Sequence, residues 1–497
     1  MTIGKRRLLC GAIGWVVAAG AGPAFAEDLS GLDRGHRLLI EHGFQLVALV
    51  DADMTSTANW RKAGFTTMMF SDHYASSDPT GQTRGEDLAQ FPTTQWGRLT
   101  WRPETSSSSL RDILTAGEKP HASKLTMLQY LDEQLINKPD VVKDAEIVLA
   151  DWRKRYPRAI AFTNQVGGVW KPAILENYMN QARPDMLYFD RYVFKGRVAG
   201  KPEDEEHRRH YLVLQRTREA ALAGHAGSAH KPIPYGMYTQ NTVIPRNDHT
   251  TSESETRFQY FTALAFGCKS IAAFTYARDI RIDGLRHYMF RGANTPDVPN
   301  DTDPLPLFFV FADCNRQTLN LAPALVRLLS TDVRVVPGRK SNGELNSLDD
   351  TRVKAWDAGA DPYITSIAAA NPGKLNGGRP GDVVVGYFKP LLPRTNHKGE
   401  DDIYFLIVNG LTHPKGSSAD TTQTITITFD FADSRIKSLE RLSRENGRVE
   451  EISDASNGWT HVGGSAYKLE LTLPGGTGDL FKFKAAAGST FASTPAL

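Results

Sequence analysis

Apolar runs and polar residues alternate regularly through the first two thirds of the chain. Short runs rich in β-branched and aromatic residues end in polar residues, and each is followed by a stretch with helical spacing of its apolar positions. Strands that alternate with helices predict βαβ units and a parallel sheet. The expected strands lie at residues 44–50, 65–70, 97–101, 125–131, 159–163, 186–189, 233–238 and 270–274. Eight such units fit a (β/α)₈ TIM barrel, which we expect over residues 27–335.

Three of the expected helices have a clear pattern. Residues 141–155 place Val142, Ala145 and Val148 on one face at helical spacing. Ser252 followed by Glu255 has the spacing of a capping box, which predicts the start of a helix. Residues 315–329 are expected to form the last helix of the barrel.

The pattern changes after about residue 334. Helical periodicity gives way to alternating strands at residues 383–388, 404–409, 424–430 and 467–473, separated by turns rich in Gly, Pro, Asn and Asp. This pattern is typical of an antiparallel β-sandwich, which we expect over residues 336–485, with residues 338–380 serving partly as a linker. The small and polar residues 486–497 are expected to be a disordered tail.

The first residues have the pattern of a secretory signal. Lys5, Arg6 and Arg7 precede an apolar stretch, and Ala24 and Ala26 flank Phe25 in a small-x-small cleavage site. The apolar stretch is shorter than the roughly 20 residues that span a bilayer. We therefore expect residues 1–26 to be a signal peptide, and the protein to be exported to the periplasm or the medium with no membrane attachment after cleavage.

Charge and composition narrow the choice of partner. Removing residues 1–26 leaves 55 basic and 56 acidic residues, with the two signs interspersed. Such a chain lacks the basic surface of a nucleic-acid-binding protein, so we expect a neutral substrate and no nucleic acid. The pattern does not predict an oligomeric state.

No metal or cofactor is expected from the motifs. His207 and His210 follow two glutamates, but the HExxH order is absent. Cys268 and Cys314 stand far apart and outside any metal-ligand spacing, so they are either a disulfide or two buried small apolar residues.

The ends of the expected strands carry the candidate chemistry. Carboxylates and amides recur there, and the C-terminal ends of barrel strands converge on one pocket. Amides and carboxylates bind hydroxyl groups and aromatic rings stack on sugar faces, so the pattern indicates a carbohydrate substrate. The candidate substrate-binding residues are Asp51, Asp72, His73, Asp132, Asn164, Gln165, Trp170, Tyr192, Tyr238, Gln240 and Tyr276.

Cleavage of a glycosidic bond needs two carboxyl groups. One donates a proton to the leaving oxygen, and the other acts as nucleophile or activates water. Asp132 and Glu133 follow one strand directly, and Asp190 follows another. Because adjacent strand residues point to opposite sides, only one of Asp132 and Glu133 is expected to face the pocket unless a turn begins between them.

Several motifs resemble those of (β/α)₈-barrel glycoside hydrolases. Residues 130–134, Tyr-Leu-Asp-Glu-Gln, resemble their strand-four "DEP" or "NE" motif. Residues 156–165, 184–192 and 263–276 resemble segments of bacterial hydrolase-like barrels, the last being similar to their eighth strand. Residues 473–480 resemble the closing strand of the C-terminal sandwich in such proteins. The resemblance implies cofactor-free hydrolysis of glycosidic bonds in an oligo- or polysaccharide, with Glu133 as general acid/base.

The chain departs from this family at strand seven. Most related retaining enzymes carry the nucleophilic glutamate there, whereas this strand ends in Tyr238, Thr239 and Gln240. Asp190 is the leading second carboxyl, since the alpha-galactosidase-like clan uses strands four and six. One alternative is a non-catalytic carbohydrate-binding barrel, a pseudoenzyme without the nucleophile. Another is a hydrolase of a different bond, because the fold does not determine the reaction.

Overall fold

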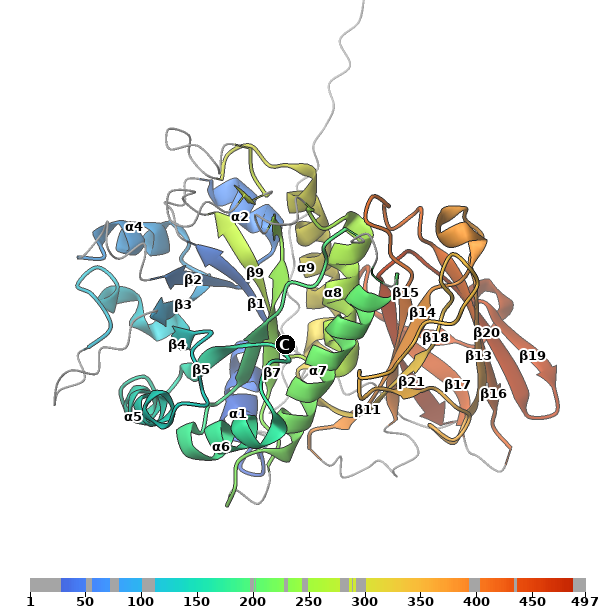
Figure 1. Ribbon diagram of the computed structural model, residues 1–497, viewed down its shortest axis with the longest axis horizontal. Coiled ribbons are helices and arrows are strands. Elements are labelled where there is room, and N and C mark those ends of the chain that lie inside the picture. Colours follow the sequence, from blue (N-terminus) through green and yellow to red (C-terminus); the bar gives the residue numbers. More distant parts are fainter. Residues whose placement is uncertain are drawn as a thin grey trace, which may run out of the picture.

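The computed structural model contains a closed barrel of eight parallel strands (Figure 1). It describes residues 28–50, 56–71, 80–100, 112–196, 201, 203–227, 231–243, 249–277, 286–287, 289–291, 301–392, 403–432 and 436–485. In order around the barrel the strands are β1 (Gln45–Val50), β2 (Thr67–Ser71), β3 (Gln95–Thr100), β4 (Leu125–Asp132), β5 (Ile160–Val166), β6 (Leu187–Asp190), β7 (Tyr235–Gln240) and β9 (Ser270–Ala277). The predicted (β/α)₈ barrel is confirmed.

Helices surround the barrel. They are α1 (Arg34–His42), α2 (Thr57–Ala63), α4 (Gln82–Gln90), α5 (Pro139–Arg155), α6 (Pro172–Ala182), α7 (Glu205–Ala223), α8 (Glu253–Phe266) and α9 (Pro306–Leu325), with a 3₁₀ turn at Lys119–Lys124. The apolar face predicted for α5 is buried, and Ser252 caps α8 in the predicted capping box with Glu255. The bounds predicted for the last helix are wrong, because Pro306 occupies its first turn and the chain leaves the helix after Leu325.

Two β-sheets form the C-terminal sandwich. One has the order β12-β11-β14-β15-β21-β17-β18, and the other has the order β13-β16-β20-β19. All neighbours are antiparallel except β11 and β12. The strands are β11 (Leu328–Val336), β12 (Lys354–Ala355), β13 (Ile364–Ala370), β14 (Asp382–Pro390), β15 (Tyr404–Gly410), β16 (Gln423–Asp430), β17 (Ile436–Leu442), β18 (Val449–Ile452), β19 (Trp459–Gly463), β20 (Ala466–Leu473) and β21 (Gly478–Ala485).

The sandwich begins earlier than the sequence pattern suggests. β11 pairs with β14 along its length, so the sandwich starts at Leu328 and not at residue 336. The segment 338–380, expected partly as a linker, contains β12 and β13. A short ribbon of β8 (Thr242–Val243) and β10 (Arg286–His287) completes the strands of the described residues.

Helices α8 and α9 lie between the barrel strands and the sandwich (Figure 1). Alternate residues of β14 pack either into the sandwich core or into the core shared with α8. The backbones approach closely, since a Cβ on Gly386 would lie 2.0 Å from the carbonyl oxygen of Ala265. The sandwich is therefore fixed directly against the barrel.

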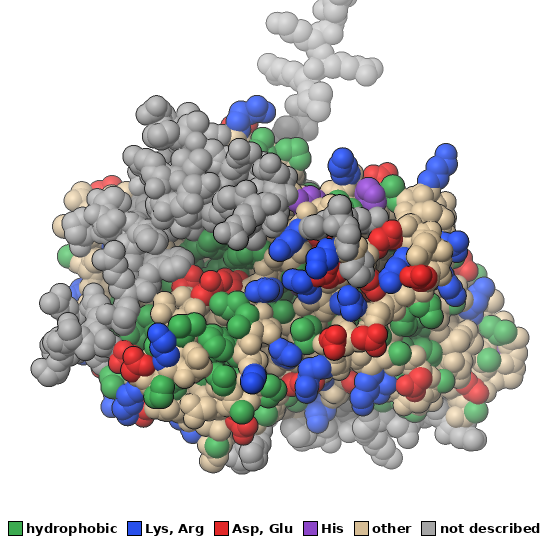
Figure 2. Space-filling view, viewed as in Figure 1, with side chains coloured by type: hydrophobic (Ala, Val, Ile, Leu, Met, Phe, Trp, Pro, Cys, Tyr) green, Lys and Arg blue, Asp and Glu red, His purple; other side chains and the backbone are tan. Residues whose placement is uncertain are grey.

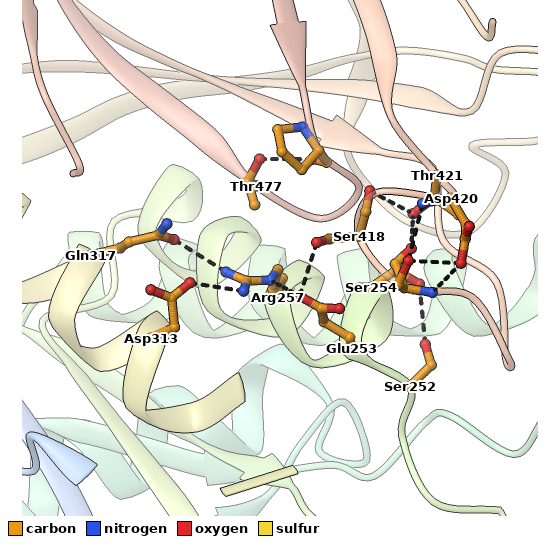
Figure 3. Close-up of polar contacts among 12 residues, drawn as sticks. Ser252, Glu253, Ser254, Arg257, Asp313, Gln317, Ser418, Asp420, Thr421 and Thr477 are labelled. Atoms are coloured by element: carbon orange, nitrogen blue, oxygen red, sulfur yellow. Dashed lines mark hydrogen bonds and ion pairs between the residues drawn. The ribbon is translucent and has the colours of Figure 1, made fainter. Parts of the chain in front are cut away.

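Polar contacts reinforce this interface (Figure 3). Arg257 of α8 donates to Glu253 at 2.9 Å and pairs with Asp313 of α9 at 2.8 Å. Ser418 of the sandwich donates to the same Glu253 oxygen at 2.9 Å. These groups connect both helices to the sandwich.

The N-terminal end of the barrel, which we call the floor, is closed by α1. Leu38 and Leu39 pack into the barrel interior. Gln45 donates to Gln95 at 3.1 Å and accepts from Thr67 at 2.8 Å. The floor is therefore a packed layer with internally paired polar groups.

Two further predictions concern the cysteines and the membrane. Cys268 and Cys314 are both buried and free, so they are two small buried residues and the disulfide alternative is wrong. Among the residues that the structure describes, no helix is both long enough and apolar enough to cross a bilayer.

Candidate active site

Three polar side chains meet at the C-terminal ends of β4, β5 and β6, which we call the mouth. Asn164 of β5 is buried and donates to Asp132 of β4 at 2.7 Å and to Asp190 of β6 at 3.2 Å. One amide thus holds carboxylates from two strands in fixed relation. The structure brings together these three predicted residues.

An irregular backbone at the end of β4 positions the acids. The register against β5 shifts between Gln129 and Asp132, and Leu131 and Glu133 have φ angles of 63° and 53°. Left-handed non-glycine residues are strained and cluster at functional sites. Leu131 joins the outer core, whereas Asp132 turns inward and accepts from Gln129 at 3.2 Å. These turns allow the adjacent acids Asp132 and Glu133 both to lie near Asp190, which regular strand alternation would prevent.

Asp190 lies in an unusual electrostatic environment. Its side chain is buried, it is hydrogen-bonded to Glu133, and both Glu133 and Asp132 stand close enough to disfavour its charge. Burial is the largest cause, and together these effects raise the pKa of Asp190 well above its ordinary value, although the Asn164 amide acts in the opposite direction. Glu133 itself is exposed. The buried member of the pair is therefore the favoured site for a proton.

Aromatic rings line the barrel beside these acids. Tyr192 stacks on Phe274 with ring centres 5.6 Å apart, and Tyr238 donates to Gln129 at 2.7 Å. The buried Tyr192 hydroxyl has no hydrogen-bond partner among the described residues. Its pKa is raised by burial and by the neighbouring Asp190 and Asp132 carboxyls, so it stays a neutral donor. A ligand hydroxyl or ring oxygen in the mouth would provide the missing partner.

Four predicted binding residues lie away from the mouth. Gln165 faces the helix layer and donates to Thr163 at 2.6 Å. Gln240 donates to and accepts from the backbone of Phe194, and therefore braces the segment after β6. These two amides were expected to bind substrate, but strand alternation turns Gln165 toward the helices, and Gln240 is paired with the backbone of Phe194.

The other two are aromatic. Tyr276 is fully buried outside the barrel against Trp60 and Phe65, with ring centres 5.4 and 5.8 Å away. Trp170 lines a cavity between α6 and α7. Asp51, Asp72 and His73 lie outside the described residues.

Gln129 and Phe274 belong to the mouth but were not among the predicted site residues. Gln129 shares the inward side of β4 with Met127, and a glutamine at an inward position of an apolar strand was a usable indication. Phe274 resembles any core aromatic in the sequence, so nothing local distinguishes it. Within the described part of the chain, no three His, Cys, Asp or Glu residues are grouped to hold a metal ion.

Comparisons with known proteins add no family. No protein-family model and no curated protein matches the chain. Similar solved structures include an arabinofuranosidase (8% identity, 90% of this chain and 97% of that chain covered, TM-score 0.44). They also include an endo-β-1,4-mannanase from Thermotoga petrophila (10% identity, 90% and 96% covered, TM-score 0.35) and the YdjI aldolase from Escherichia coli K12 (10% identity, 48% and 77% covered, TM-score 0.29). We draw neither an activity nor a substrate from likenesses this distant; the fold rests on the closed barrel itself.

Proposed function

We propose that this protein is an exported glycoside hydrolase that cleaves glycosidic bonds in an oligo- or polysaccharide. The observation that carries the proposal is the buried Asp190 beside the exposed Glu133 at the mouth of a (β/α)₈ barrel. A buried carboxyl with a raised pKa beside a second, exposed carboxyl provides the two acidic groups that this reaction requires. The predicted signal peptide, residues 1–26, supports export but lies outside the described residues.

The environment of each acid favours a division of roles. Asp190, the acid whose pKa is raised, would donate a proton to the glycosidic oxygen as the bond from the anomeric carbon to that oxygen breaks. Glu133 would attack the anomeric carbon or accept a proton from the water that attacks it. The family resemblance implies that Glu133 is the acid/base. The burial of Asp190 instead favours Asp190 as the residue that donates the first proton.

A sugar that binds between the two carboxyls needs room. Carboxyl groups stand about 5–5.5 Å apart in retaining glycosidases and about 6.5–9.5 Å apart in inverting ones. Glu133 lies close enough to Asp190 to raise its pKa. Because Glu133 is exposed, its side chain has room to turn outward when a sugar enters, whereas the buried Asp190 does not.

The test is a substrate screen with reducing-end detection on the purified protein, using neutral oligo- and polysaccharides. We expect turnover of at least one glycan, and expect Asp190→Asn and Glu133→Gln to abolish it while the glycan still binds. Turnover that survives both substitutions would contradict the assignment.

One observation favours a second candidate, a carbohydrate-binding barrel without catalysis. Strand β7 ends in Gln240, whose amide is committed to the backbone of Phe194, so the usual position of the nucleophile is held by a bracing residue. This candidate predicts glycan binding without turnover in the unmodified protein. It also predicts little change in affinity when Glu133 becomes glutamine.

A further inference from the structure

A second cavity lies on the outer side of the barrel, between α6 and α7. Its volume is about 280 Å³, at the lower end of small-molecule pockets. Its lining is mostly apolar and includes Trp170, Leu175, Met179, Ala220 and Ala223. Hydrophobic side chains also gather on the face in Figure 2, over the side where Figure 1 draws α5, α6 and α7. Nothing in the proposed hydrolysis uses this cavity.

The cavity wall contains one cation without a neutralising partner. Arg216 of α7 donates through Nη1 to the carbonyl oxygen of Gly168 at 2.6 Å, and its Nε is buried without a hydrogen-bond partner. Within the described residues it forms no ion pair. A guanidinium next to apolar surface has lost part of its hydration. A bound anion offsets that free-energy cost through charge-assisted hydrogen bonds.

The acid nearest along the same helix is already committed. Glu219, which also lines the cavity, accepts from Gln215 at 3.0 Å and from Nε and Nη2 of Arg352 at 2.8 and 2.7 Å. Both of its oxygens therefore accept from other donors. Glu176 of α6 also lines the cavity, but among the described residues neither acid forms an ion pair with Arg216. The charge of Arg216 remains available to a ligand.

We propose that this cavity binds a small amphipathic carboxylate, with its apolar body between α6 and α7 and its carboxylate on Arg216. A sugar fits less well, because the aliphatic walls at Leu175, Met179 and Ala220 would leave several of its hydroxyl groups without partners. An alkyl or aryl carboxylate satisfies both the apolar walls and the single cation. Trp170, expected from the sequence to contact the substrate in the mouth, belongs to this second site.

Isothermal titration calorimetry with octanoate tests the proposal on the full protein. We expect saturable one-to-one binding, and at least about tenfold weaker binding of octanamide, which lacks the charge. Arg216→Met should weaken octanoate binding by at least about tenfold, and Ala220→Phe, which fills the cavity and keeps the cation, should also weaken it.

The matched control is Arg209→Met, the same substitution on the same helix. Arg209 pairs with Glu205 and does not line the cavity, so this variant should bind octanoate as the unmodified protein does. Three results would overturn the proposal. They are no binding at millimolar octanoate, binding of octanamide as tight as that of octanoate, or octanoate affinities of Arg216→Met and Ala220→Phe equal to that of the unmodified protein. Preferential binding of neutral oligosaccharide that is lost in Ala220→Phe would also overturn it.

Discussion

Two buried aspartates at opposite ends of strand β6 show how differently the two ends of this barrel are built. Asp185 stands two residues before β6 on the floor, and Asp190 ends the same strand at the mouth. They are 3% and 6% exposed, so burial disfavours the charge of both. Their neighbours are what distinguish them.

Asp185 is surrounded by donors. It pairs with Arg34, lies 3.8 Å from Arg153, and accepts from the backbone of Ala161 at 2.8 Å. Burial raises the pKa of Asp185, but the two arginines oppose that rise. Around Asp190 the neighbouring acids add to the effect of burial instead. A buried acid paired with cations stabilises the fold. A buried acid beside other acids has a raised pKa and is suited to donate a proton.

The largest expected effect is on turnover at the mouth. Asp190→Asn keeps the shape of the side chain but removes its proton-donating carboxyl. We expect kcat on the best substrate to fall by about 100-fold to 10,000-fold, as removal of an acid/base group does. Initial rates measure this loss, and thermal unfolding should show no destabilisation, because the neutral amide matches the size and the uncharged state of a protonated Asp190.

The matched change on the floor should affect folding. Asp185→Asn leaves Arg34 and Arg153 without their anion, and breaking a buried pair costs about 3 kcal/mol or more. Urea denaturation measures the change, while the folded fraction should keep its kcat. If Asp185→Asn had normal stability and low activity, the floor would not be separable from the mouth in function.

Smaller effects are expected from pH. The folded pKa of Asp190 is raised above its unfolded value, so its contribution to stability is complete below the unfolded pKa of about 3.9 and is lost as pH rises through the folded pKa. Asp190→Asn lacks this loss, so its stability relative to the unmodified protein should increase with pH. Urea titrations at several pH values between 4 and 8 measure the difference. A constant difference would mean that Asp190 is ionised in the folded protein.

The smallest expected effects come from two hydroxyl groups. Tyr238→Phe removes the donor to Gln129, which in turn contacts Asp132, and should lower kcat a few-fold. Thr67→Val removes the donor to Gln45 on the floor and should cost about 1 kcal/mol without affecting kcat. Rates and urea midpoints of both variants provide the comparison. Equal loss of activity in both would show that floor and mouth are not functionally separate.

Much of the fold could be predicted where burial leaves a simple pattern. Residues 383–385 are a continuous valine run because β14 is buried on both faces, whereas β16 alternates isoleucine and threonine because one face is open. β11 was not predicted, since the leucines at its start continue the apolar pattern of α9. Only pairing with β14 makes that segment a strand.

The candidate site could be predicted in part. Asp132, Asn164 and Asp190 follow from their positions at strand ends, because parallel strands share one C-terminal edge. Trp170 follows β5 and Tyr276 lies near the end of β9, but both pack away from the mouth. Local residue types do not determine which way a side chain points at or after the end of a strand.

The sequence alone determined the order of strands and helices, the polar strand ends, and the presence of acids on the fourth and sixth strands, because these depend on residue type and spacing. The tertiary structure decided which acid is buried among other acids, which way each aromatic ring faces, and that Arg216 lines an apolar cavity. Those properties arise from residues far apart in the chain, and their electrostatic and packing energies exist only once the strands have closed into a barrel.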